Sequence, residues 1–80
     1  MVYFVIECQS NGSTGTTIVN TYQTRDEAES KFHLILSAAA VSSVMKHGAI
    51  LFSDNMAEIM TKVYDHPVEV VEENEEESNG

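Results

Sequence analysis

The segment formed by residues 24–43 constrains the fold more than any other part of the chain, because it has the pattern of one capped helix. Thr24 has the hydroxyl typical of an N-cap, and Glu27, three positions later, completes a capping box. We expect the helix to end near Ser42 and Ser43. Five apolar side chains recur at helical spacing and should lie on a sheet: Ala28, Phe32, Ile35, Leu36 and Ala39.

Strand-like segments flank this helix on both sides. Residues 2–9 and 16–23 are rich in β-branched and aromatic side chains, and the turn-forming sequence SNGSTG joins them. After the helix, residues 48–53 and 56–66 are two further strands, joined at Asp54 and Asn55, which tolerate the positive φ of a tight hairpin. The sequence therefore predicts an α+β fold of ββαββ order, a four-stranded antiparallel sheet with one helix packed on one face.

The first predicted strand has one wholly apolar face. Side chains alternate along a strand, so Val2, Phe4, Ile6 and Cys8 share a face, which we expect to meet the core. Cys8 is then a buried structural thiol rather than a nucleophile. As the only cysteine, it forms no internal disulfide, which fits a reducing compartment.

The second half of the helix is apolar on nearly every side. From Leu34 to Val41, every residue except Ser37 is apolar, whereas a single sheet covers only one face of a helix. We therefore expect a homo-oligomer, a dimer or higher, that packs helix on helix. Its predicted interface consists of Leu34, Ala38, Val41 and Met45. In the alternative interpretation, alanine simply favours helix, and isolated apolar residues are exposed as on ordinary monomers.

Length and charge indicate one small acidic domain. The 80 residues suffice for a single domain, predicted at residues 1–67, followed by an acidic tail at 68–80. The tail holds six of the 13 acidic residues and no base, so the net charge of −9 falls to −3 without it. We expect the tail to be disordered and solubilising; alternatively, it adds a short strand or binds a basic partner.

The same features limit location and partners. The N-terminus lacks the basic region of a signal peptide, and no apolar stretch approaches the roughly 20 residues of a membrane span, so we expect a cytoplasmic protein that does not bind membranes. Without a basic patch, direct binding to nucleic acid is disfavoured, and acidic mimicry of nucleic acid is an alternative.

Chemistry-bearing residues form no catalytic pattern. The stretch NGSTGTT lacks the lysine of a phosphate-binding loop and leads into a strand. The three histidines lie 14 and 19 residues apart, without the short spacing of a zinc site. His33 is expected at the edge of the helix–sheet contact, His47 and His66 at partly exposed strand ends, and Glu7 and Glu58 facing solvent. The sequence thus predicts no enzyme, cofactor or metal.

Polar and aromatic residues near the strand ends are candidates for binding. Lys46, His47, Tyr64 and His66 are expected to line a groove between subunits, where a host protein or a nucleotide-like small ligand binds.

Residues 26–49 resemble a family of short uncharacterised proteins of phages and prophages from gut Firmicutes. The block AESKFHLILSAAAVSS, with His47 after it, carries the resemblance. It implies a phage accessory protein acting in a bacterial host cytoplasm, and no functional residue is transferred with it. The hypothesis that follows is a non-enzymatic, oligomeric binding module, an anti-defence protein that blocks or sequesters a host factor or ligand. The alternatives are a structural or assembly protein of the phage particle and an acidic mimic of nucleic acid.

Overall fold

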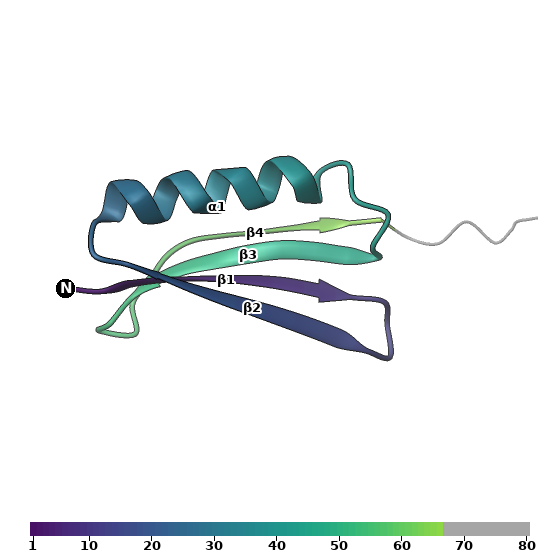
Figure 1. The fold of residues 1–80 in the computed structure, drawn as a ribbon. Helices are drawn as coiled ribbons and strands as arrows, with labels where there is room; N and C mark the ends of the chain where they lie inside the picture. Colours follow the sequence, from purple (N-terminus) through teal and green to yellow (C-terminus); the bar gives the residue numbers. More distant parts are fainter. Residues whose placement is uncertain (67–80) are drawn as a thin grey trace, which may run out of the picture.

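The computed structural model describes residues 1–66, so the predicted boundary at residue 67 and the acidic tail lie outside the described residues. Two strands, β1 (Tyr3–Ser10) and β2 (Gly15–Tyr22), precede the helix α1 (Arg25–Ala39), and two strands, β3 (Lys46–Ser53) and β4 (Glu58–Asp65), follow it. The strands form one antiparallel sheet in the order β2-β1-β3-β4, and α1 lies along one face of it (Figure 1). The predicted ββαββ fold is confirmed.

The helix begins as its sequence predicts. The Thr24 hydroxyl accepts a hydrogen bond from the Glu27 backbone N–H at 3.2 Å, and the Thr24 carbonyl accepts one from Ala28 at 3.2 Å. The first bond satisfies an amide that has no backbone partner within the helix, and the second is the first backbone bond of the helix itself.

The helix ends at Ala39, earlier than predicted. The Val41 and Ser42 amides reach back only three residues, to Ala38 and Ala39, which tightens the last turn. The Ser42 hydroxyl accepts a bond from the Val44 amide at 3.0 Å. This local bond competes with continued helix, as serine side chains commonly do.

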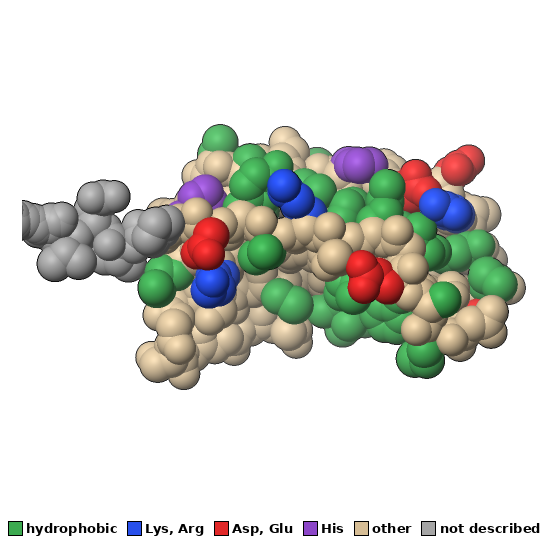
Figure 2. Space-filling view, turned by 180° about the vertical axis from the view of Figure 1, so that it is seen from behind, with side chains coloured by type: hydrophobic (Ala, Val, Ile, Leu, Met, Phe, Trp, Pro, Cys, Tyr) green, Lys and Arg blue, Asp and Glu red, His purple; other side chains and the backbone are tan. Residues whose placement is uncertain are grey.

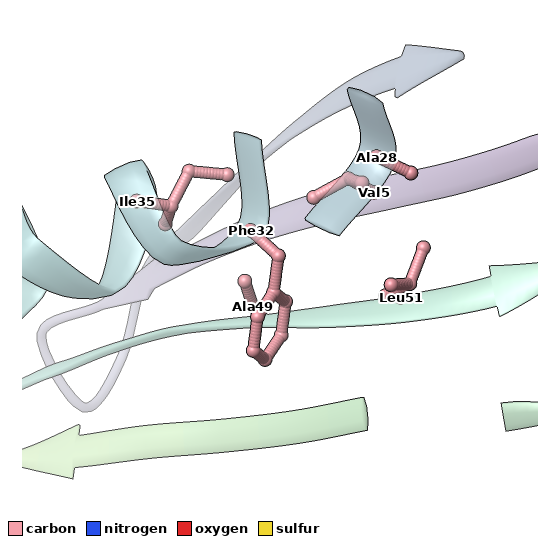
Figure 3. Packing of buried hydrophobic residues seen from close by; sticks show 6 residues of the cluster. All are labelled: Val5, Ala28, Phe32, Ile35, Ala49 and Leu51. Atoms are coloured by element: carbon pink, nitrogen blue, oxygen red, sulfur yellow. The ribbon is translucent and has the colours of Figure 1, made fainter. Parts of the chain in front are cut away.

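The core lies between α1 and the two central strands. Four helical residues at the predicted spacing are buried, namely Ala28, Phe32, Ile35 and Ala39, whereas Leu36 is half-buried. Figure 3 shows Ala28, Phe32 and Ile35 packed with Val5 of β1 and with Ala49 and Leu51 of β3. The predicted helical stripe is therefore confirmed apart from Leu36.

The orientation predicted for β1 is wrong. Val5 is fully buried under the helix, with Tyr3 packed against the same core. Phe4 and Ile6 are half-buried and Cys8 is exposed, so the buried thiol is also wrong. The set Val2, Phe4, Ile6 and Cys8 points away from the helix because alternation places it opposite Val5.

The turn between β3 and β4 uses a different residue from the one predicted. Asp54 and Asn55 keep negative φ, and the left-handed position is Met56, with φ 62°. The Met56 amide bonds to the Ser53 carbonyl at 2.9 Å, closing a three-residue hairpin loop. Asp54 is used elsewhere, because its side chain accepts a bond from the Val2 amide at 3.0 Å.

Candidate interaction surface on the open face of the sheet

The face of the sheet opposite α1 carries large apolar side chains. The register places Phe4, Ile6 and Cys8 of β1 beside Phe52, Ile50 and Gly48 of β3. The rings of Phe4 and Phe52 stack, with centroids 5.2 Å apart and planes inclined by 22°. No other helix or strand of residues 1–66 packs on this side, which we call the open face. Figure 2 shows hydrophobic atoms forming a broad area in the right half of the view from behind.

The outer strands extend the open face. Val19 of β2 pairs with Ile6 and is 57% exposed, and Val63 of β4 pairs with Gly48 and is 60% exposed. Beside these valines the outer strands carry hydroxyl rather than charged side chains on this face, from Thr17 and Thr21 of β2 and Thr61 of β4.

Charged groups lie only at the ends of the open face. Lys46 and Asp65 pair across β3 and β4, with Nζ 3.0 Å from Oδ2. Glu58 pairs with Phe52 at the other end. The interior of the face is uncharged, so its chemistry is that of an apolar contact surface.

A hollow of about 390 Å³ lies on the open face at the Lys46 end. Its lining includes Cys8, Ile50 and Val63 around Gly48. Glycine is needed at position 48 because a Cβ there would lie 2.3 Å from the Lys62 carbonyl oxygen of β4. The hollow exceeds the roughly 150 Å³ in which an engineered protein cavity holds benzene, so it has room for an aromatic side chain.

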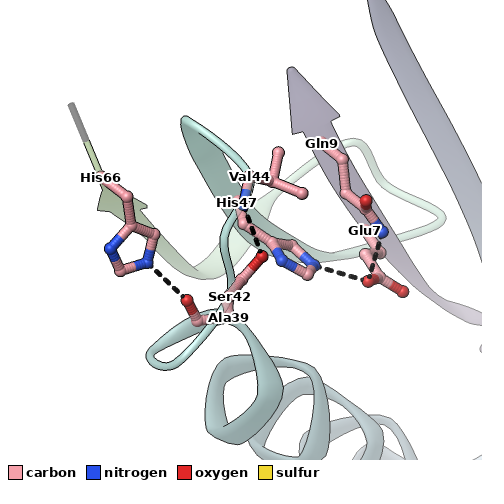
Figure 4. A network of polar contacts seen from close by, with 7 residues as sticks. All are labelled: Glu7, Gln9, Ala39, Ser42, Val44, His47 and His66. Atoms are coloured by element: carbon pink, nitrogen blue, oxygen red, sulfur yellow. Dashed lines mark hydrogen bonds and ion pairs between the residues drawn. The ribbon is translucent and has the colours of Figure 1, made fainter. Parts of the chain in front are cut away.

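The opposite, helix-covered face holds a polar cluster (Figure 4). His47 Nε2 lies 2.7 Å from Glu7 Oε2, and Gln9 donates to the same oxygen at 3.2 Å. The side chains of His47 and Glu7 are only 7% and 16% exposed, so the partly exposed ring predicted for His47 and the solvent-facing position predicted for Glu7 are wrong. Within residues 1–66, His47 Nδ1 and Asn20 Nδ2 are buried without hydrogen-bond partners.

This cluster links β1 to β3 through Glu7 and His47, and its residues line neither of the two hollows. The first hollow is lined as above, and the second, of about 420 Å³, lies at the start of the helix beside Tyr22 and Glu27. Because neither hollow is lined by Glu7 or His47, we interpret the cluster as a contact that holds β1 to β3.

The four predicted ligand-binding residues do not line one groove. Lys46 lies at the end of the open face, whereas His47 and Tyr64 pair across strands on the helix side. The His66 ring stacks on Tyr64, with centroids 6.4 Å apart, and its Nε2 donates to the Ala39 carbonyl at 2.8 Å. His66 therefore caps the C-terminal end of α1, a role that sequence reasoning missed.

The predicted oligomer interface is divided in the structure. Leu34 and Ala38 of α1 are exposed, Leu34 to 64%, and Val41, two residues after the end of the helix, is 86% exposed. Met45 is half-buried in the segment before β3, where its amide bonds to Asn11 Oδ1 at 3.4 Å. His33 is exposed, not at the edge of the helix–sheet contact, and its ring meets Phe32 edge-on. Coverage of Leu34, Ala38 and Val41 by another copy stays a prediction.

Sequence reasoning missed the open face because it assigned Phe4 and Ile6 to the core. The sequence did contain a signal for a second apolar face: the runs YFVI in β1 and AILF in β3 are apolar at every position. Continuous apolar runs are typical of strands that are covered on both faces.

Two further observations concern sites of other kinds. Within residues 1–66, no three histidine, cysteine, aspartate or glutamate side chains are grouped to hold a metal ion. In the same part of the chain, no helix has the length and apolar character needed to cross a bilayer.

Comparison with known proteins gave no matching family model, no matching curated protein and no matching solved structure. The resemblance of residues 26–49 to short phage proteins thus stays a prediction.

Proposed function

We propose that this protein is a non-enzymatic, oligomeric binding module whose contact surface is the open face. The observation that carries the proposal is the uncovered interior of that face, where Phe4, Ile6, Ile50 and Phe52 form an apolar, uncharged area. Large contiguous apolar patches that no part of the protein covers are typical of interaction sites.

The positions of the polar groups support a binding role. A side chain that acts as general acid or base must lie within hydrogen-bonding reach of a bound substrate. Glu7 and His47 are instead bonded to each other beneath the helix, and His66 is bonded to the helix end. The apolar hollow on the open face is lined by Cys8, Lys46 and Lys62 among others, and by no histidine.

The phage resemblance gives the proposal a context. A short accessory protein in a host cytoplasm acts by occupying a surface of a host factor or by sequestering a ligand, which requires a contact surface and no chemistry. Inhibition of a bacterial defence factor is the form of this function that we favour.

A structural role in the phage particle is the second candidate, and one arrangement favours it. Leu34 of α1 and Val41, just after its end, are exposed, and the open face lies on the side of the sheet opposite α1. A subunit with apolar surfaces on two opposite sides can contact two neighbours, as subunits of larger assemblies do.

Mimicry of nucleic acid receives less support. Of the acidic groups in residues 1–66, Glu7 is bonded to His47, Glu29 to Arg25 and Asp65 to Lys46. The remaining acidic side chains form no continuous row along one strand or along the helix.

Native mass spectrometry of the tagged full chain, purified from host lysate, tests the proposal. We expect masses that correspond to several copies, to a copy with a retained partner, or to both. A mass of one bare copy would contradict the proposal, as would turnover of nucleotides or phosphate esters by purified protein at enzyme-like rates. Stoichiometric recovery in phage particles would favour the structural role.

A further inference from the structure

We propose that the occupant of the open face is a second copy of this chain, packed sheet against sheet about a two-fold axis. This inference rests on the proposed function and names the partner. It places the self-contact on the side of the molecule opposite the helical interface predicted from Leu34 and Val41.

The first argument is the apolar character of the open side of β1. An antiparallel sheet with one solvated face normally places its apolar side chains toward the core and its polar ones toward water. In β1, the helix side carries Glu7 and Gln9 as well as Tyr3 and Val5, whereas the open side carries Phe4 and Ile6. β3 is apolar on both sides, with Ala49 and Leu51 facing the helix. This distribution is typical of a sheet covered on both faces.

The second argument is area. Strands of eight residues rise about 26 Å, and four strands side by side span about 19 Å, so the open face measures about 500 Å². Two such faces bury about 1,000 Å² in total, which reaches the lower limit for a specific protein–protein interface. Sheets stacked about 10 Å apart form the core of every β-sandwich.

The third argument is charge. The chain carries a net charge of −9, so two copies repel each other unless the contact avoids acidic groups. The interior of the open face is uncharged, and its one basic end group, Lys46, is already paired with Asp65. The outer side of the helix start instead presents Asp26 and Glu27.

The fourth argument is shape. The stacked pair Phe4 and Phe52 stands at one end of β1 and β3, and the hollow around Gly48 lies four residues along both strands. Four residues correspond to about 13 Å along a strand. In a two-fold contact, if residue i of one copy meets residue j of the other, then j also meets i. The aromatic pair of each copy can therefore fill the hollow of the other.

Another occupant is available in the chain itself. The sequence after residue 66 contains Val68, Val70 and Val71, and β4 ends beside the hollow that Val63 lines. Glutamates interrupt these valines, so they match an uncharged face less well than a second copy does. The experiment below separates the two occupants.

Sedimentation equilibrium of the full chain tests the inference, with Val63→Lys as the main variant. Val63 is exposed on an edge strand, so lysine is tolerated by the monomer and clashes only with an apolar partner. We expect a wild-type dimer and a dissociation constant at least tenfold higher for Val63→Lys. Leu34→Lys, a matched change at an exposed helical residue, should leave the dimer intact. Far-UV circular dichroism verifies that both variants fold, and Val19→Lys, on the other edge strand, replaces Val63→Lys if that variant unfolds.

The single cysteine gives a second readout. Cys8 is exposed on the open face of the monomer, so dimerisation should slow its reaction with a maleimide at least tenfold at high protein concentration. Dilution or Val63→Lys should restore the rate.

Each other outcome overturns the inference in a distinguishable way. A dimer that dissociates with Leu34→Lys and leaves Cys8 reactive moves the contact to the helix and preserves the proposed function. A monomer whose Cys8 becomes reactive only after Val68→Ser, Val70→Ser and Val71→Ser assigns the open face to the tail. A bare monomer with reactive Cys8 that also retains no partner from lysate removes the proposed function as well.

Discussion

The two faces of the sheet are built from neighbouring residues and differ in what covers them. Leu51 faces the helix and is fully buried, whereas Ile50, one residue earlier, faces away and is half-buried. The covered face also includes the bonded polar groups Glu7 and His47, while the interior of the open face is apolar. The comparison teaches that the more apolar side of a strand need not be the one that meets its own core.

A matched pair of truncations gives the largest expected difference between the faces. Leu51→Ala should lower the free energy of unfolding by about 2–5 kcal/mol, because it leaves a cavity in the core. Ile50→Ala should cost about 1 kcal/mol in a dilute sample, since its side chain is already partly exposed. Urea unfolding measures both values. At high protein concentration the loss for Ile50→Ala should grow, because dimerisation stabilises the folded state by mass action. Equal losses for the two variants at every concentration would remove the distinction between the faces.

The polar cluster tests whether the covered face depends on its internal bonds. His47→Leu leaves the Glu7 carboxylate enclosed without its histidine, and should cost about 2 kcal/mol of stability. The double variant Glu7→Leu, His47→Leu should recover part of this loss, because it removes both polar groups. Thermal unfolding of the three proteins makes the comparison.

Lys46→Ala is the control for that experiment. It breaks an exposed ion pair on the open face, and exposed pairs contribute less than about 1 kcal/mol. If Lys46→Ala cost as much as His47→Leu, enclosure would not explain the effect of the cluster.

A substitution at Met56 in the turn should change the stability of the fold without affecting the contacts of either face of the sheet. A side chain in the left-handed region is strained, whereas glycine adopts it freely. Met56→Gly should therefore stabilise the fold by about 0.5–1 kcal/mol, since the strain removed exceeds the added chain entropy. The melting temperature should rise with the dimer dissociation constant unchanged. A lower melting temperature would show that the exposed Met56 side chain contributes packing.

Salt should have the smallest effect on the contact between copies. Screening of the net charge of −9 should strengthen association about threefold between about 0.05 and 0.5 M salt, since the open face has an uncharged interior. Sedimentation equilibrium at both concentrations measures this change. A contact that weakened steeply with salt would depend on ion pairs instead, as the nucleic-acid mimic requires.

Much of the fold could be predicted from the sequence because its signals are local. The cap at Thr24, the spacing of Phe32 and Ile35, and the turn-forming residues before Gly15 each act within a few positions. These signals predicted the ββαββ order, which the structure confirms.

The candidate site was much less predictable, because its position depends on contacts distant in sequence. Lys46 and His47 are adjacent in the chain but lie on opposite faces of the sheet. His66 lies at the partly exposed end of β4, as expected, but its contact with the Ala39 carbonyl, 27 residues away, was not predicted. The sequence indicated that the helix's own sheet does not cover Leu34 and Val41, and both are exposed in the single chain. Whether another copy covers them depends on the assembly.

By itself the sequence determined the elements, their order and the helical face that meets the sheet, since each follows from periodicity within one segment. Only the tertiary structure decided which side of β1 meets the helix. Both sides carry apolar residues, and Val5, Glu7 and Gln9 can turn inward because Glu7 finds His47 as a partner 40 residues away. A polar side chain can be enclosed when its hydrogen bond is satisfied, and that partner exists only after β1 and β3 have paired.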